Sequence, residues 1–191
     1  PPLAYLLAYF PAALTIVLLP MISEIWARRK KEVVRKVTHF LIKFSFICII
    51  PAAFVFMAFP GTALLAFTGK SEYLAAAFTL QLLTAAVIAH TLFVILQSVV
   101  TGIGKPIIAT KVIGTMAGLN FIVNLMLIPI YGFLGAAIAT LLSRFFGLVL
   151  MLYLTRKIIM FTLPTRSLLT SLGAGIITLF LILTLKTIVT I

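Results

Sequence analysis

Six long apolar stretches constrain this chain more than any other feature of its sequence. Each is about as long as the roughly 20 helical residues that cross the core of a bilayer. Their length, and the lack of a two-residue alternation, exclude membrane strands. The pattern predicts an all-α integral membrane protein with about six transmembrane helices, at Leu3–Ile25, Phe40–Phe59, Leu74–Val100, Ile107–Ile128, Phe133–Leu154 and Leu168–Ile191.

The composition excludes the main alternatives. Hydrophobic residues make up 63% of the 191 residues and charged residues only 9%, whereas roughly a quarter of an ordinary soluble domain is charged. A soluble fold of this size cannot hide so much apolar surface, and a disordered chain would be far more polar. No stretch is typical of a signal peptide. The chain begins without Met, so we expect it to be a fragment of a longer protein.

Charge alternates along the predicted loops. Lys70 is the only basic residue of the second loop and the fourth has no charge, whereas the first, third and fifth loops carry the remaining basic loop residues. Because basic loops remain in the cytoplasm, these three loops are predicted to face it. Lipid headgroups and topology thereby account for the net charge of +12, and no nucleic-acid partner is expected. The basic loop residues are Arg28, Arg29, Lys30, Lys31, Arg35, Lys36, Lys105, Arg156, Lys157 and Arg166.

Small residues predict a tight hairpin between the fourth and fifth spans. Gly114 and Gly118 are four residues apart and share a helix face. Small side chains let helices approach closely in a membrane, where packing holds them together. The fifth span carries a continuous stripe of them, at Gly135, Ala139, Ser143 and Gly147.

Arg144 is the most informative polar residue, because it lies near the middle of the fifth span. An Arg at that depth costs roughly 2.5–3.5 kcal/mol on insertion scales. The chain has no Asp, and its three Glu residues lie in loops or near span ends. Two interpretations are open. Arg144 lines a polar cavity and meets phosphate or another anion, or it snorkels or pairs with a carbonyl.

Four other polar residues within the spans are candidates for a functional role. His90 and Gln97 are seven residues apart and therefore share a face, which is compatible with a hydrogen-bonded packing role or with a proton relay. Asn120 and Asn124 are four apart on the fourth span. They either hold helices together or offer amides to a sugar or a lipid headgroup.

The residues needed for catalysis are missing. Without Asp there is no Ser–His–Asp set, and paired carboxylates are absent. The two His and the single Cys48 are isolated, so no metal site is expected, and Cys48 is interpreted as a small apolar residue. The run Gly102–Pro106 is similar to a phosphate loop, but Val99 and Pro106 break that pattern. The sequence therefore predicts a protein that is not an enzyme and needs no cofactor.

Three segments resemble polysaccharide flippases, of the superfamily that also contains multidrug and toxin extrusion transporters and lipid II flippases. The hairpin Asn120–Thr140 resembles the signature motif of polysaccharide flippases, which is fairly specific to the superfamily. Leu19–Glu24 resembles the end of the family's eighth helix, and Gln97–Pro106 resembles the motif between helices ten and eleven. Arg144 departs from the pattern, because an amide or an acid often follows the Ser there.

The resemblance implies a fold and a function. Residues 1–160 would be helices of the C-terminal lobe of a two-lobe flippase, and 161–191 an additional transmembrane helix. Such a protein flips oligosaccharide linked to polyprenyl pyrophosphate from the cytoplasmic to the outer leaflet of the cell (plasma or inner) membrane by alternating access. Its partners would be the bilayer, that substrate and the missing N-terminal lobe. The implied substrate-binding residues are Arg144, Lys111, Asn120, Asn124, His90 and Gln97.

Two other functions compete with this one. A cation-coupled multidrug or toxin exporter usually has a carboxylate within the membrane, which this chain lacks at mid-depth. A membrane assembly subunit that transports nothing is the other alternative. Short loops and polar residues at the centre of spans argue against it.

Overall fold

The computed structural model describes residues 2–70, 74, 76–162, 169–178, 180 and 184. No strand occurs among them, so the prediction of an all-α fold is confirmed. A helical stretch at Leu169–Thr178 follows the main helices. Those helices are α1 (Pro2–Ala27), α2 (Lys31–Ala58), α3 (Pro60–Thr68), α4 (Ala77–Gly102), α5 (Pro106–Tyr131) and α6 (Phe133–Ile159).

Four of these helices are long and apolar enough to cross a membrane: α2, α4, α5 and α6. They coincide with the second to fifth predicted spans. Helix α1 coincides with the first and has a similar length, 26 residues. The sixth predicted span, 168–191, lies mostly outside the described residues. A multi-pass membrane protein is therefore established, whereas the count of six spans stays a prediction.

Prolines set several helix boundaries. Helix α2 ends at Ala58 because Phe59 precedes Pro60, and a residue before proline is disfavoured in the helical conformation. Pro60 then begins α3, since the first turn of a helix needs no donor from it. Pro106 begins α5 in the same way. The expectation of a loop alone between the second and third spans is wrong, because α3 lies there.

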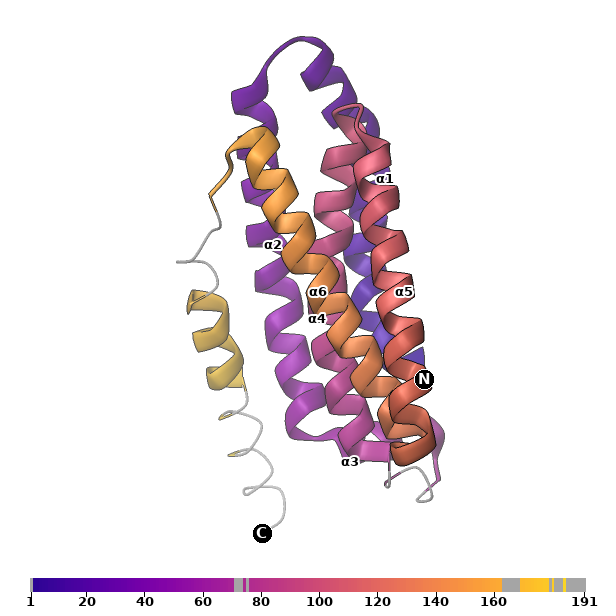
Figure 1. Ribbon diagram of the computed structural model, residues 1–191. Helices are drawn as coiled ribbons and strands as arrows, with labels where there is room; N and C mark the ends of the chain where they lie inside the picture. Colours follow the sequence, from indigo (N-terminus) through magenta and orange to yellow (C-terminus); the bar gives the residue numbers. More distant parts are fainter. Residues whose placement is uncertain are drawn as a thin grey trace.

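The short turns on either side of α5 depend on glycine. Gly104, between α4 and α5, has φ +80°, and Gly132, between α5 and α6, has φ +55°. Side chains with a Cβ rarely adopt these angles. The two turns reverse the chain within a few residues, so α5 runs antiparallel to both neighbours (Figure 1).

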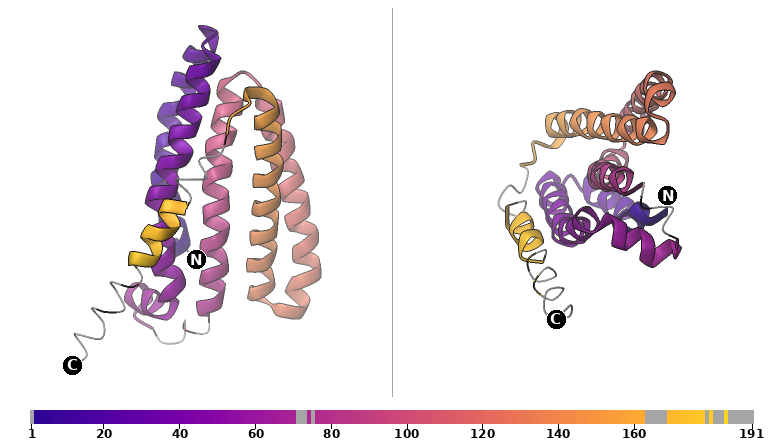
Figure 2. Two further views of the ribbon diagram at one scale, coloured as in Figure 1. Left: turned by 90° about the vertical axis from the view of Figure 1, so that its left-hand side faces the viewer. Right: turned by 90° about the horizontal axis from the view of Figure 1, so that it is seen from below.

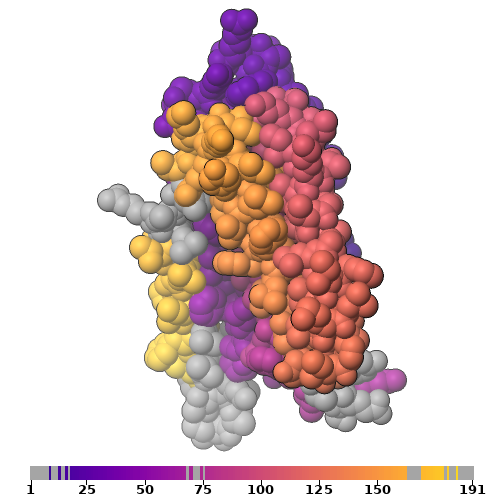
Figure 3. All heavy atoms as spheres, in the orientation of Figure 1, coloured from indigo at the N-terminus to yellow at the C-terminus, as the bar shows by residue number. Residues whose placement is uncertain are grey.

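Helix α4 is the centre of the bundle. It packs extensively against α1, α2 and α6, and only slightly against α5 (Figures 1 and 2). Its residues Ile95, Leu96, Val99 and Val100 are fully buried in the main hydrophobic cluster. Helix α5 packs mainly on α6, and together they form a separate layer that covers one face of the molecule (Figure 3).

The basic turns gather at one end. The α1–α2 turn, the α4–α5 turn and the end of α6 lie together, whereas the α2–α3 and α5–α6 junctions lie at the opposite end (Figure 1). The fold thus brings the first and third predicted loops, and the described start of the fifth, to the same side, as the charge pattern requires. The assignment of that side to the cytoplasm stays a prediction.

The small-residue stripe on α6 is buried and faces α5. A Cβ added to Gly135 would lie 2.6 Å from the carbonyl carbon of Leu127, and one added to Gly147 would overlap Met116. Close packing of the hairpin through this stripe is confirmed. Gly114 and Gly118 differ, because a Cβ on either would meet nothing within 4 Å. The expectation that their face also packs closely is wrong for the described residues.

Candidate functional site

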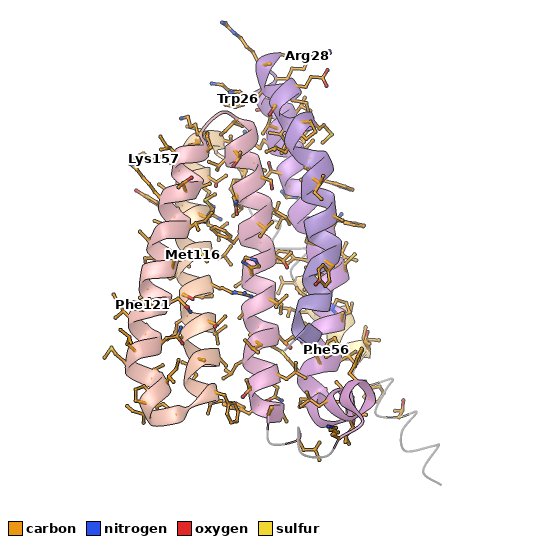
Figure 4. The ribbon with its side chains drawn as sticks, turned by 90° about the vertical axis from the view of Figure 1, so that its right-hand side faces the viewer. Trp26, Arg28, Phe56, Met116, Phe121 and Lys157 are labelled. Carbon is orange, nitrogen blue, oxygen red and sulfur yellow. The ribbon has the colours of Figure 1, made fainter. Side chains whose placement is uncertain are left out.

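A cavity of about 480 Å³ lies between α4, α5 and α6. Its residues come from the middle of each helix, so it lies near mid-depth of the membrane spans. Met116 of α5 is one of the lining residues, and Figure 4 shows it between the α5–α6 hairpin and α4. The cavity is lined by His90, Phe93, Gln97, Ile113, Met116, Ala117, Asn120, Thr140, Ser143 and Arg144.

The cavity follows from the way the three helices pack. Helix α6 lies against α4 along one face and against α5 along its small-residue stripe. Because α4 and α5 hardly touch each other, a hollow remains between them with α6 as its floor. The residues of α6 at that floor, Thr140 and Ser143, are small and polar, which leaves the hollow open and partly polar.

Arg144 lies on the wall of this cavity. Its side chain is partly buried, and its Nη1 has no exposed surface. Its guanidinium interacts electrostatically with His90. The two described glutamates form exposed pairs with Arg28 and Arg35, so neither is its counterion. Of the two interpretations, the structure places Arg144 on a cavity wall, while contact with an anion stays a prediction.

Asn120 takes part in a chain of hydrogen bonds between α5 and α6. Its Nδ2 donates to Oγ of Ser143 at 3.1 Å, and that hydroxyl donates to the carbonyl of Thr140 at 3.1 Å. Asn124 Nδ2 in turn donates to Asn120 Oδ1 at 2.9 Å. Asn120 therefore holds the hairpin together, as one of its two interpretations required. It also lines the cavity, so its amide has a side open to a ligand.

His90 and Gln97 line the cavity from the same face of α4, as their spacing predicts. The His90 ring stacks on Phe93 with 6.2 Å between centroids. Its Nδ1 is buried and makes no hydrogen bond to the described residues. An unsatisfied buried polar atom costs about 1–3 kcal/mol, so a ligand or water that reached this atom would bind more favourably there.

Two of the six predicted binding residues are not on the cavity wall. Lys111 is exposed, and Asn124 reaches the cavity only through its bond to Asn120. Thr140 and Ser143 line the cavity as well, although the sequence pattern does not predict Thr140 there and indicates only helix packing for Ser143. Their position on the helix face beside Arg144 was the available signal.

The cavity offers one permanent cation, amide groups, hydroxyls and an imidazole beside apolar side chains. This combination suits a ligand that carries both an anionic group and many hydroxyls. Within the part of the chain that the structure describes, no group of three His, Cys, Asp or Glu could hold a metal ion.

Comparison with known proteins gives a consistent result. The family model described as "Lipid II flippase MurJ" matches residues 4–191. The "Uncharacterized membrane protein MJ1068" of Methanocaldococcus jannaschii is 31% identical over 158 residues, or 83% of this chain and 31% of that protein. The "Probable low-salt glycan biosynthesis flippase Agl15" of Haloferax volcanii is 27% identical over 134 residues, or 70% of this chain and 28% of that protein.

The match covers a limited part of these relatives. The aligned region spans 31% and 28% of their lengths. No solved structure matches the chain significantly.

Proposed function

The chain belongs to the MurJ family of lipid II flippases, and from this premise we propose that it is part of a transporter of lipid-linked oligosaccharide. The family indicates a membrane transporter rather than an enzyme. The substrate we propose is an oligosaccharide on polyprenyl pyrophosphate. It would pass from the cytoplasmic to the outer leaflet of the cell membrane by alternating access. The likeness to a protein named as a glycan biosynthesis flippase supports this choice.

The observation that carries the proposal is the position of Arg144 on the wall of a mid-depth cavity. A guanidinium in the middle of a membrane is expensive, roughly 2.5–3.5 kcal/mol even on insertion scales. A cavity that binds an anion compensates for part of this cost, because the cation offsets the desolvation of the anion.

The lining residues suggest how the substrate is held. Arg144 would bind the pyrophosphate, because a guanidinium donates in pairs to phosphate oxygens. Asn120, Gln97 and Thr140 would contact the sugar hydroxyls through their amides and hydroxyl. The polyprenyl chain would stay in the bilayer, because an apolar chain needs no free energy of transfer to remain among lipid tails. The sugar would cross through the wet cavity, which opens to each side in turn.

The rest of the transporter would come from outside this chain. We propose that residues 1–160 form part of a C-terminal lobe, that 161–191 add a further transmembrane helix, and that an N-terminal lobe closes the cavity from the other side. The open gap between α4 and α5 is the side that such a lobe would cover.

Reconstitution of the full-length protein in vesicles tests the proposal. Arg144→Ala should lower the flipping rate of a polyprenyl-pyrophosphate oligosaccharide about tenfold or more, because a hydrogen bond to a charged group contributes roughly 1.5–3 kcal/mol. Arg144→Lys, which keeps the charge, should lose less. Lys157→Ala removes an exposed cation from the same helix and should leave the rate unchanged.

Two results would count against the proposal. Flipping by Arg144→Ala at the normal rate would remove this residue from the mechanism. A full-length protein that flips no lipid-linked oligosaccharide would overturn the function itself.

A further inference from the structure

A second cavity lies at the basic end of the molecule, and it shares no residue with the first. Its volume is about 340 Å³. Four of its lining side chains carry or can carry positive charge, and all four belong to α2. We call it the basic cleft, and it is lined by Arg35, Lys36, His39, Phe40, Lys43 and Thr162.

The spacing along α2 places the cations on one side of the helix. Lys36 and Lys43 are seven residues apart, so they are two turns apart on the same face. The rise between them is about 10 Å. This is close to the thickness of the headgroup region of one leaflet, roughly 5–8 Å. Lys43 lies at the apolar edge, from which a long side chain extends toward the headgroups.

The segment that follows α6 closes one side of the cleft. Nδ1 of His39 lies 3.1 Å from the carbonyl oxygen of Thr162. A carbonyl only accepts hydrogen bonds, so Nδ1 carries the proton and donates it. The bond fixes the imidazole ring and leaves its Nε2 for other partners. The cleft is therefore built by two segments far apart in the sequence.

The cleft also has an apolar side. Phe40 is 61% exposed, although it lies among cations. Its ring stacks on Phe44 with 6.1 Å between centroids. An exposed aromatic ring at the end of a membrane span contacts the acyl chains of lipids. An amphipathic ligand would contact both the ring and the cations.

Acidic side chains neutralise little of this charge. Nη1 of Arg35 lies 3.4 Å from Oε1 of Glu32, but both side chains are largely exposed, and such pairs are weak. Among the described residues, neither Lys36 nor Lys43 forms an ion pair. The cleft therefore keeps a net positive charge at the end of a membrane span.

From this arrangement we propose that the basic cleft binds the phosphate headgroup of an anionic membrane lipid. Lys36 and Lys43 bind the phosphate, and Phe40 contacts the adjoining part of the acyl chains. The site is separate from the mid-depth cavity and does not depend on the proposed flipping function. Its ligand is a resident lipid of the leaflet at the basic end.

Binding of lipids to the full-length protein in detergent tests the site. Native mass spectrometry would measure the dissociation constants of dioleoyl phosphatidylglycerol and of dioleoyl phosphatidylcholine. The anionic lipid should bind several-fold more tightly. Lys36→Gln and Lys43→Gln should each weaken its binding about fivefold, since each cation near a membrane surface contributes about 1 kcal/mol.

Lys105→Gln is the matched control. It removes the same charge from the same end of the molecule, but Lys105 lies in the α4–α5 turn outside the cleft. This variant should bind phosphatidylglycerol as the natural protein does. Equal weakening by all three substitutions would overturn the proposal, because it would show a general effect of charge. No weakening by Lys43→Gln would overturn it as well.

Inorganic phosphate separates a lipid site from a simple anion site. At millimolar concentration it should fail to displace phosphatidylglycerol, because it lacks the acyl chains that contact Phe40. Displacement by phosphate, together with unchanged lipid binding in Phe40→Ser, would show that the cleft binds a free anion. That outcome would overturn the assignment to a lipid.

Discussion

Helices α4 and α5 have the same length and nearly the same hydropathy, yet the fold uses them differently. Each has 26 residues. In the most apolar stretch of α4, 61% of the residues are buried inside the protein, and in that of α5 none are. The two helices follow one another and are joined by one short turn. Their hydropathy alone would predict the same position within the helix bundle for both.

The difference shows that hydropathy places a helix in the membrane but not within the bundle. Lipid tails are as apolar as a protein core, so an apolar residue is equally suited to either. What separates the two helices is their set of neighbours, because α4 packs against α1, α2 and α6, whereas α5 packs mainly on α6. Helix α4 meets α1 at Gly102, where a Cβ would lie 2.8 Å from Ile22. Gly114 and Gly118 of α5 meet nothing within 4 Å.

The largest expected difference between α4 and α5 is in the stability lost when a leucine side chain is truncated. Leu96 of α4 is fully buried, whereas Leu125 of α5 is 62% exposed. Leu96→Ala should lower the free energy of unfolding by about 2–4 kcal/mol through the cavity it leaves. Leu125→Ala should change it little, because lipid or detergent fills the gap. Denaturation of the full-length protein in detergent measures both, and equal effects would mean that α5 is buried as deeply as α4.

A smaller difference in stability is expected when a methyl group is added to a glycine of each helix. Gly102→Ala would force Ile22 and α1 to move, which should destabilise the protein by about 1–3 kcal/mol. Gly118→Ala adds a methyl group in open space and should be neutral or stabilising by up to about 1 kcal/mol, because alanine favours a helix. Thermal unfolding of the two variants compares them directly. A cost at Gly118 as large as that at Gly102 would reveal a helix packed against α5.

The smallest effect concerns the hydrogen bond that joins α5 to α6. Ser143→Ala removes the acceptor of Asn120 Nδ2 and should destabilise the protein by about 0.6 kcal/mol, the average for such bonds in membranes, and by no more than about 1.7 kcal/mol. Thr110→Ala removes an exposed hydroxyl that bonds only within its own helix, so it is the control. If the two variants unfold alike, the hairpin depends on its small-residue stripe alone.

Part of the candidate site was readable from the sequence. The depth of Arg144 and the shared face of His90 and Gln97 follow from helix geometry within one span, and the structure places all three on one cavity. Lys111 is also a cation within a predicted span, so the sequence predicts it beside them. It lies outside, because its direction depends on how α5 is rotated against α6, which no local pattern specifies.

The sequence by itself determined the long helices α1, α2, α4, α5 and α6, their apolar character, the short turns on either side of α5 and the charge of each turn. These depend on residues close together in the chain, such as Pro106 or Gly132, and on transfer between water and lipid. Only the tertiary structure decided that α4 is central, that α5 is peripheral, and that Asn120, Ser143 and Arg144 meet around one cavity. The physical reason is that helix association in a membrane depends on close packing and on hydrogen bonds between distant segments. Hydropathy predicts which segments enter the membrane, but it does not predict which helices then pack against one another, because lipid tails are as apolar as a protein core.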